Sequence, residues 1–499
     1  MTEAPRVVTL DTGRIRGQRT QHTRVFSGIR YAEQPVGDRR WTAPAPAAAW
    51  SGVADATKPG PLCPQPGMPA AMIDEDCLFL NVTTPRQESA DPLPVMVWLH
   101  GGGFTTGGGH LYDAQRLAAQ GNVAVVTINY RLGVFGYFGY AGLPGSGTFG
   151  LADQLEALRW VRRNAAAFGA DPHNVTVFGQ SAGAMSIGAL LTSPEAAGLF
   201  DRAIMQSGSP MLHWPRGVMF PRSPEHSPYP HLSDVEASGA RLADQLGCGG
   251  EDAVARLRSL DSATLVEHTG DFANHLAWGT SLLPRHPADA VRNGLVHDVP
   301  ILSGIARDEM RPFIAGAHQV NPITDERLPE LLANSFGDHA SAVAETYDVS
   351  RGSALMTWSA IATDSSWAYA VHREHELLAS SAPVYAYAFA DRTAPNVNGA
   401  EVPGFPMGAA HAADMPYLFD LGGEDMLTAE QHALADEMIG SWASFAHDGE
   451  PSAAHSPPWP RFDEDEFVMG FDERGARQVD FRERHRLDFW RSVHSDLRR

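Results

Sequence analysis

The sequence predicts an α/β fold: a central, mostly parallel sheet flanked by helices. Residues 123–128 and 175–178 are β-branched runs that are too short for helices and are bounded by Gly and Asn, as buried strands are. Residues 94–100 form a third apolar run, and a segment with helical character follows each of the three. Alternation of strand and helix indicates parallel strands covered on both faces. The helical segments are residues 113–120, 151–168 and 181–193.

Two more strands are expected later in the chain, at 299–302 and 384–389. Between the strands lie long stretches of mixed helical character, at about 220–295 and 318–380. We interpret both as insertions that cover the active edge of one continuous sheet, because no linker is long or polar enough to separate domains. The sequence therefore predicts a single catalytic domain over residues 1–499.

Charge and composition limit the kinds of molecule that the chain is expected to bind. The 499 residues carry 59 acidic and 38 basic side chains, a formal net charge of −21, which repels nucleic acid and anionic membranes. The N-terminal segment lacks a basic stretch followed by an apolar one, and no apolar run approaches eighteen residues. We expect a soluble, cytoplasmic protein that is a monomer or a weak homo-oligomer and binds neither nucleic acid nor membranes.

Residues 179–183, Gly-Gln-Ser-Ala-Gly, match the G-x-S-x-G pattern of a nucleophile on a sharp turn. The pattern alone is weak evidence in a chain with 48 glycines. Here a strand-like segment precedes the motif and a helical segment of small residues follows it, which is the strand-turn-helix setting that the motif requires. We therefore predict Ser181 as a nucleophile, in preference to a surface serine in a glycine-rich turn.

Acyl transfer also needs hydrogen-bond donors for the oxyanion, and His100-Gly-Gly-Gly-Phe104 supplies a candidate loop after a predicted strand. We assign the backbone N–H groups of Gly102, Gly103 and Ala182 to the oxyanion hole. A phosphate-binding loop is the alternative for these glycines, but the Gly-Lys-Ser/Thr sequence of such loops does not follow them.

The partners of the serine should be an acid and then a histidine, later in the chain. A loop after the predicted strand at 299–302 carries Asp308 and Glu309, and spacing alone does not choose between them. His411 lies in a segment of small residues that would allow it to approach other backbone. From the residues alone, an ordinary loop histidine is an equal alternative.

These motifs together resemble the type-B carboxylesterase and cholinesterase-like family, whose members have the α/β-hydrolase fold. The resemblance runs through most of the chain and implies Glu309 as the triad carboxylate and His411 as the general acid and base. It implies a serine carboxylic-ester hydrolase that acts on a small-molecule ester and water, through an acyl-enzyme, without metal or organic cofactor. The segments that carry the resemblance are 26–32, 75–82, 100–104, 129–133, 153–154, 168–183, 304–309 and 411–417.

Two alternatives remain beside an esterase on small neutral esters. The same triad can cleave amides or carbamates when leaving-group protonation is well arranged. Some cholinesterase-like proteins are non-catalytic interaction modules, but those usually lack a triad member and carry secretion signals, whereas Ser181, Glu309 and His411 are all present here.

The chain departs from the family at two places. Gln180 stands where most members carry glutamate, so we expect weaker attraction for cationic substrates. Cys63 and Cys77 stand where the family has its first disulfide, yet no aromatic residue lies between them, so the choline-stacking tryptophan of cholinesterases is missing. The cytoplasm would keep both thiols reduced, so we predict no bridge in the cell.

Two further groups of residues have ambiguous roles. The segment His372-Arg-Glu374-His375-Glu376 has metal-like spacing, but we interpret it as a charged helix face without a matched third ligand. Aromatic side chains in or near the insertions either line a substrate pocket or, as we favour, pack in the core. These are Trp214, Phe272, Trp278 and Phe313.

Overall fold

The computed structural model describes residues 7–87, 89–220, 223–350, 352–463 and 465–496. Residues 221–222 of the first expected insertion and the first six residues of the N-terminal segment lie outside the described residues. Within the described ranges, no helix is both long enough and apolar enough to cross a membrane.

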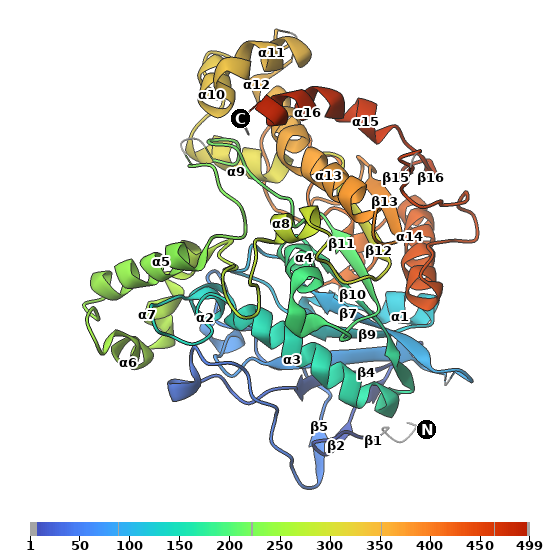
Figure 1. The fold of residues 1–499 in the computed structure, drawn as a ribbon. Helices are drawn as coiled ribbons and strands as arrows, with labels where there is room; N and C mark the ends of the chain where they lie inside the picture. The colour runs from blue at the N-terminus through green and yellow to red at the C-terminus, as the bar shows by residue number, and fades with distance from the viewer. Residues whose placement is uncertain (1–6, 88, 221–222, 351, 464, 497–499) are drawn as a thin grey trace.

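An eleven-stranded sheet forms the centre of the molecule (Figure 1). Its seven middle strands, from β9 to β15, pair in parallel, and the strands at both ends pair antiparallel. The predicted α/β-hydrolase fold with a mostly parallel sheet is confirmed. In sheet order the strands are β16 (Gly475–Gln478), β15 (Val468–Asp472), β13 (Val384–Phe389), β12 (Ile301–Ala306), β11 (Arg202–Gln206), β10 (Ala170–Gln180), β7 (Leu93–Leu99), β9 (Ala124–Ile128), β6 (Phe79–Pro85), β4 (Thr23–Arg30) and β3 (Gln18–Arg19).

Alternate residues of the central strands enter two separate cores. Val95 and Val97 of β7 belong to the core that contains the helices α3 (Phe149–Asn164) and α4 (Ala182–Thr192). Met96 and Trp98 belong to the core on the opposite face, beneath α1 (Gln115–Gly121) and α14 (Ala429–Asp448). Every residue of β7 is buried, as expected for a strand covered on both faces.

Helices fill the long connections on either side of β12. Figure 1 shows α5, α6 and α7 grouped on the left and α10, α11 and α12 at the top. A π-helix, Thr363–Ala368, joins α12 to α13. Before β12 lie α5 (Leu232–Gln245), α6 (Ala253–Arg258), α7 (Ser262–Val266) and α8 (Pro287–Arg292); after it lie α9 (Arg311–Val320), α10 (Leu328–Phe336), α11 (Ala340–Thr346), α12 (Ala354–Ala362) and α13 (Tyr369–Leu378).

The remaining strands and helices lie outside the eleven-stranded sheet. They form two small sheets, each of which joins segments that are distant in sequence, and three further helices, two of them near the C-terminus. One small sheet contains β1 (Val7–Thr9), β2 (Arg14–Arg16) and β5 (Val53–Asp55), and the other contains β8 (Tyr112–Asp113) and β14 (Asp420–Leu421). The helices are α2 (Gly133–Tyr137), α15 (Phe481–Arg484) and α16 (Leu487–Asp496).

Candidate active site

Ser181 occupies the turn between β10 and α4. Its backbone has φ 56° and ψ −121°, a region that non-glycine residues enter only under strain. The Ser181 N–H donates to the carbonyl oxygen of Gln206 at 2.8 Å, which ties the turn to the neighbouring strand β11. Gly183 is required for this sharp turn, because a Cβ there would collide with the carbonyl oxygen of Leu99. Ser181 thus lies at the carboxyl edge of the sheet and keeps 8% of its surface exposed.

The glycine loop that follows β7 runs beside this turn. A Cβ on Gly101 would lie 3.1 Å from Cβ of Ser181, so loop and nucleophile turn are in contact. Gly102 has φ +109° and a Cβ there would collide with the carbonyl oxygen of Thr106. Within the described parts of the chain, the N–H groups of Gly102, Gly103 and Ala182 have no hydrogen-bond acceptor. Free N–H groups at this position are what an oxyanion hole requires.

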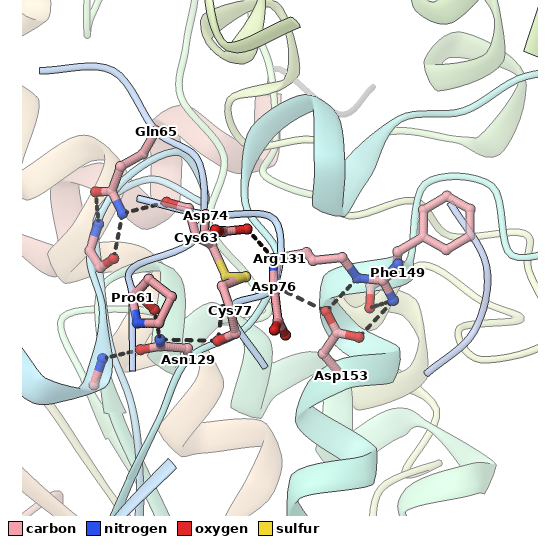
Figure 2. The surroundings of a disulfide bond; sticks show 12 residues. Pro61, Cys63, Gln65, Asp74, Asp76, Cys77, Asn129, Arg131, Phe149 and Asp153 are labelled. Atoms are coloured by element: carbon pink, nitrogen blue, oxygen red, sulfur yellow. Dashed lines mark hydrogen bonds and ion pairs between the residues drawn. A yellow bond between two sulfur atoms is a disulfide. The ribbon is translucent and has the colours of Figure 1, made fainter. Parts of the chain in front are cut away.

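The segment closed by the Cys63–Cys77 disulfide is joined by hydrogen bonds to the residues that follow the glycine loop (Figure 2). Gln65 within this segment donates to the carbonyl oxygen of Gly107 at 2.8 Å and accepts from its N–H at 2.8 Å. Asn129 bonds to the carbonyl oxygen of Cys77 at 3.1 Å and accepts from the N–H of Gly109 at 2.8 Å. The structure thus contains the bridge of the family, while the redox state of the two cysteines in the cell stays a prediction.

His411 and Glu309 form a buried pair. Nδ1 of His411 lies 2.5 Å from Oε2 of Glu309, and the second carboxylate oxygen accepts the N–H of Ala306 at 2.8 Å. Glu309 is fully buried, so its charge has the imidazole as its partner. Asp308, the competing acid, points elsewhere: its carboxylate accepts from Arg311 at 2.8 Å and from the N–H of Ala409 at 3.1 Å.

The other ring nitrogen of His411 faces the nucleophile turn. Its Nε2 lies 3.1 Å from Nε2 of Gln180, the residue before Ser181. Among the described residues no hydrogen bond joins the side chains of Ser181 and His411, and bonds between catalytic groups often form fully only when substrate binds. The sequence marked Gln180 as a departure from the family but gave no sign that its amide reaches the imidazole.

Aromatic rings surround the imidazole. The rings of Phe313 and Trp367 lie 5.1 and 5.0 Å from that of His411, and Trp214 lies 6.0 Å from Trp367. Phe313 therefore lies beside the imidazole, whereas Trp214 is buried and packs against Trp367 and His226, which agrees with core packing. Phe272 packs against Phe138 and Trp278 against His231, which agrees with core packing. Trp367 was missed by sequence reasoning, because it lies in the π-helix, which leaves no periodic signal.

Two more buried acids lie near the site. Burial raises the pKa of Asp414 to about 6, although Gln206 donates to its carboxylate at 2.8 Å. Burial also raises the pKa of Glu374 to about 7, although Ser303 donates to it at 2.7 Å. Both acids are fully buried, so their titration is expected to make stability depend on pH.

The interpretation of residues 372–376 as a charged helix face is wrong. His372, Glu374 and His375 are buried, because α13 packs between the sheet and the C-terminal segments. The expectation of no matched third ligand is also wrong, since Glu466 joins His372 and Glu376 with ligand atoms within 4.8 Å of one another. Arginines already pair with these carboxylates: Arg482 lies 3.1 Å from Glu466, and Arg373 and Arg491 both contact Glu376.

Comparison with known proteins decides the family. The model of the "Carboxylesterase family" matches residues 4–490. The chain belongs to the carboxylesterase family. This confirms the resemblance to type-B carboxylesterases and the prediction of a hydrolase that acts on carboxylic ester bonds.

Named relatives of this carboxylesterase span nearly all of it. It is 36% identical to phenmedipham hydrolase of Pseudarthrobacter oxydans, over 91% of this chain and 92% of that protein. It is 35% identical to para-nitrobenzyl esterase of Bacillus subtilis (strain 168), over 92% and 93%. A solved structure of a thermophilic PNB esterase superposes with a TM-score of 0.79 at 31% identity and covers 98% of this chain and 100% of its own.

Proposed function

We propose that this carboxylesterase acts through a Ser181–His411–Glu309 triad and an oxyanion hole made of the N–H groups of Gly102, Gly103 and Ala182. The observation that carries the proposal is the 2.5 Å contact between Glu309 and Nδ1 of His411, with Nε2 of the same ring directed at the turn of Ser181. That orientation supports a proton path from the serine hydroxyl into the imidazole.

The reaction follows from these positions. Nε2 of His411 takes the proton of Ser181 as the hydroxyl oxygen attacks the ester carbonyl, and the N–H groups stabilise the oxyanion. The same nitrogen then gives the proton to the leaving alcohol, which leaves an acyl-enzyme on Ser181. Water repeats the cycle and releases the acid. Glu309 fixes the tautomer and stabilises the imidazolium.

We infer that the preferred substrates are small neutral esters. Phe313 and Trp367 give the site an apolar wall beside His411. Residues 64–76, between the two bridged cysteines, contain no aromatic side chain that could stack on a quaternary ammonium group. Choline esters are therefore expected to be poor substrates. Amides and carbamates remain the alternative substrates. Phenmedipham is a useful second test substrate, because one relative is named phenmedipham hydrolase.

The test is hydrolysis of p-nitrophenyl butyrate by the wild-type protein, by Ser181→Ala and by Ser186→Ala as a control on the same helix. Ser186 is buried in α4 and its hydroxyl accepts from Gln154, so Ser186→Ala tests the loss of a buried hydroxyl that is not part of the proposed triad. We expect a burst, steady turnover and stoichiometric organophosphate labelling in the wild type and in Ser186→Ala. Labelling or full turnover by Ser181→Ala would contradict the proposal.

A single catalytic domain, a cytoplasmic location and a monomeric or weakly associated state also belong to this proposal. Single-transition unfolding, cell fractionation and light scattering at several protein concentrations test the three parts separately. A stable oligomer at low concentration would contradict the last part.

A further inference from the structure

A cavity of about 250 Å³ lies beside the segment that carries Glu309. Four arginines line it: Arg307, Arg311, Arg484 and Arg486. This concentration of guanidinium groups stands out in a chain whose formal net charge is −21. Two carboxylates, Asp308 and Asp364, line the same cavity, which leaves an excess of two positive charges among these six groups.

Both carboxylates are already engaged by other donors. Asp364 accepts from the hydroxyl of Tyr347 at 2.6 Å and from Nδ1 of His485 at 2.6 Å, and Arg486 lies 3.3 Å from it. Asp308 accepts from Arg311 and from a backbone N–H, as described above. Neither carboxylate is left to neutralise the other two arginines.

Arg307 and Arg484 therefore face the cavity without an acidic partner in the part of the chain that the structure describes. Nη1 of Arg484 and Nε2 of His485 are buried and have no hydrogen-bond partner, and the His485 residue is only 2% exposed. Burial, together with the nearby Arg307 and Arg477, lowers the pKa of Arg484. Buried polar groups without partners are rare, so such a cluster calls for a missing acceptor.

We propose that this cavity is a binding site for a small oxyanion such as phosphate, held by Arg307 and Arg484. Guanidinium groups bind oxyanions through paired, charge-assisted hydrogen bonds, which are stronger than the bonds they form with water. The cavity is smaller than the roughly 300–1,000 Å³ of pockets for drug-sized ligands, which favours a compact anion. The site is separate from the proposed triad and depends on no catalytic assignment.

The bound anion would hold the segment next to the triad carboxylate. Arg307 is two residues before Glu309, and Thr363 on the cavity wall accepts the N–H of Met310 at 3.1 Å. Asp308 donates its N–H to the carbonyl oxygen of Ala409 at 2.8 Å, two residues before His411. An anion that ties Arg307 to Arg484 therefore connects this segment to the C-terminal helix α15.

Calorimetric titration of the full-length protein with inorganic phosphate, at constant ionic strength set with chloride, tests the site. The variants are Arg307→Gln and Arg484→Gln, with Arg392→Gln as control because Arg392 lies 3.8 Å from Asp308 but does not line the cavity. We expect about tenfold weaker phosphate binding in the first two variants and little change in the control. Absence of binding in the wild type, or equal binding in all variants, would overturn the proposal.

Thermal unfolding gives an independent readout. In chloride buffer alone, Arg484→Gln should unfold at or above the wild-type temperature, because it removes a partly buried guanidinium group that forms no ion pair among the described residues. Phosphate should raise the unfolding temperature of the wild type more than that of Arg484→Gln at the same concentration, because the variant binds phosphate more weakly. If phosphate stabilises both proteins equally, the effect is general and the site is excluded.

Discussion

Nε2 of Gln180 lies 3.1 Å from Nε2 of His411, the ring nitrogen that accepts the proton of Ser181 in the proposed mechanism. Because Nδ1 of the ring is paired with Glu309, the amide donates to the unprotonated form of Nε2. A glutamate at this position would instead accept a hydrogen bond from a protonated Nε2. The amide therefore supports the base form of the imidazole, which is the form that starts the reaction.

Gln180→Glu should move the acid limb of the kcat/KM profile to higher pH, by about one pH unit, because a carboxylate stabilises the imidazolium. Selectivity should shift toward cationic esters at the same time. The measurement is the pH dependence of hydrolysis of a neutral and a cationic ester. Gln180→Met, which is neutral and of similar size, removes the amide without adding a charge, so it should move the acid limb to higher pH by less than Gln180→Glu does. An unchanged profile and unchanged selectivity in Gln180→Glu would refute the role of the amide.

Exchange of the two adjacent acids separates their roles. Glu309→Gln should lower kcat by about 10³–10⁴-fold, because the amide no longer holds the Nδ1–H tautomer of His411. Asp308→Asn should cost far less activity, since Asp308 bonds to Arg311 and to backbone rather than to the imidazole. Steady-state rates on p-nitrophenyl butyrate, with circular dichroism to verify folding, decide between them. A larger kcat loss in Asp308→Asn would reverse the assignment.

The central strands could be predicted because their signal is local. Residues 123–128 and 384–389 are continuous apolar runs and became β9 and β13. The first part of β10, Ala170–Asn174, is polar and could not be recognised, since its strand form depends on neighbouring strands. Helix α14 and the strands β15 and β16 were likewise not predicted.

Only the parts of the candidate site that belong to sequence motifs could be predicted. The choice between Asp308 and Glu309 depends on the direction of two adjacent side chains, which spacing does not encode. The burial of His372, Glu374 and His375 escaped prediction because partners of this segment, Ser303 and Glu466, are distant in sequence. In a sequence, polar residues suggest positions that are exposed to solvent. In the folded protein, buried polar side chains can instead form hydrogen bonds with one another.

Cleavage of the disulfide should loosen the glycine loop. Cys63→Ser/Cys77→Ser should lose roughly 3 kcal/mol of unfolding free energy, as expected for a closed loop of this length, measured by urea unfolding. Activity should fall with stability because Gln65 holds Gly107. Cys248→Ser, at the buried free cysteine, is the control. Because both cysteines are buried, thiols are alkylated in cells that are quenched with acid and then denatured without reductant, which tests the expectation that the pair is reduced there. A pair that stays unlabelled in the denatured protein would show that the bridge forms in the cell.

Glu374 should make stability fall as pH rises. Its pKa is raised to about 7 by burial, so between about pH 4.5 and 7 the folded protein keeps a proton that the unfolded chain has lost. A folded state that binds more protons loses stability with increasing pH, and this contribution is complete above pH 7. Glu374→Gln keeps an uncharged group beside Ser303, so it should flatten this part of the profile and stabilise the protein at pH 8 by at most about 3 kcal/mol.

Urea unfolding at several pH values from 5 to 8 measures this effect, with Glu330→Gln on the exposed face of α10 as the matched control. Some slope should remain in Glu374→Gln, because burial also raises the pKa of Asp414 to about 6 and acts in the same direction. The double variant Glu374→Gln/Asp414→Asn should therefore be flatter than either single one. A profile identical to that of the wild type would mean that Glu374 is ionised in the folded protein, and that a donor other than Ser303 stabilises its charge.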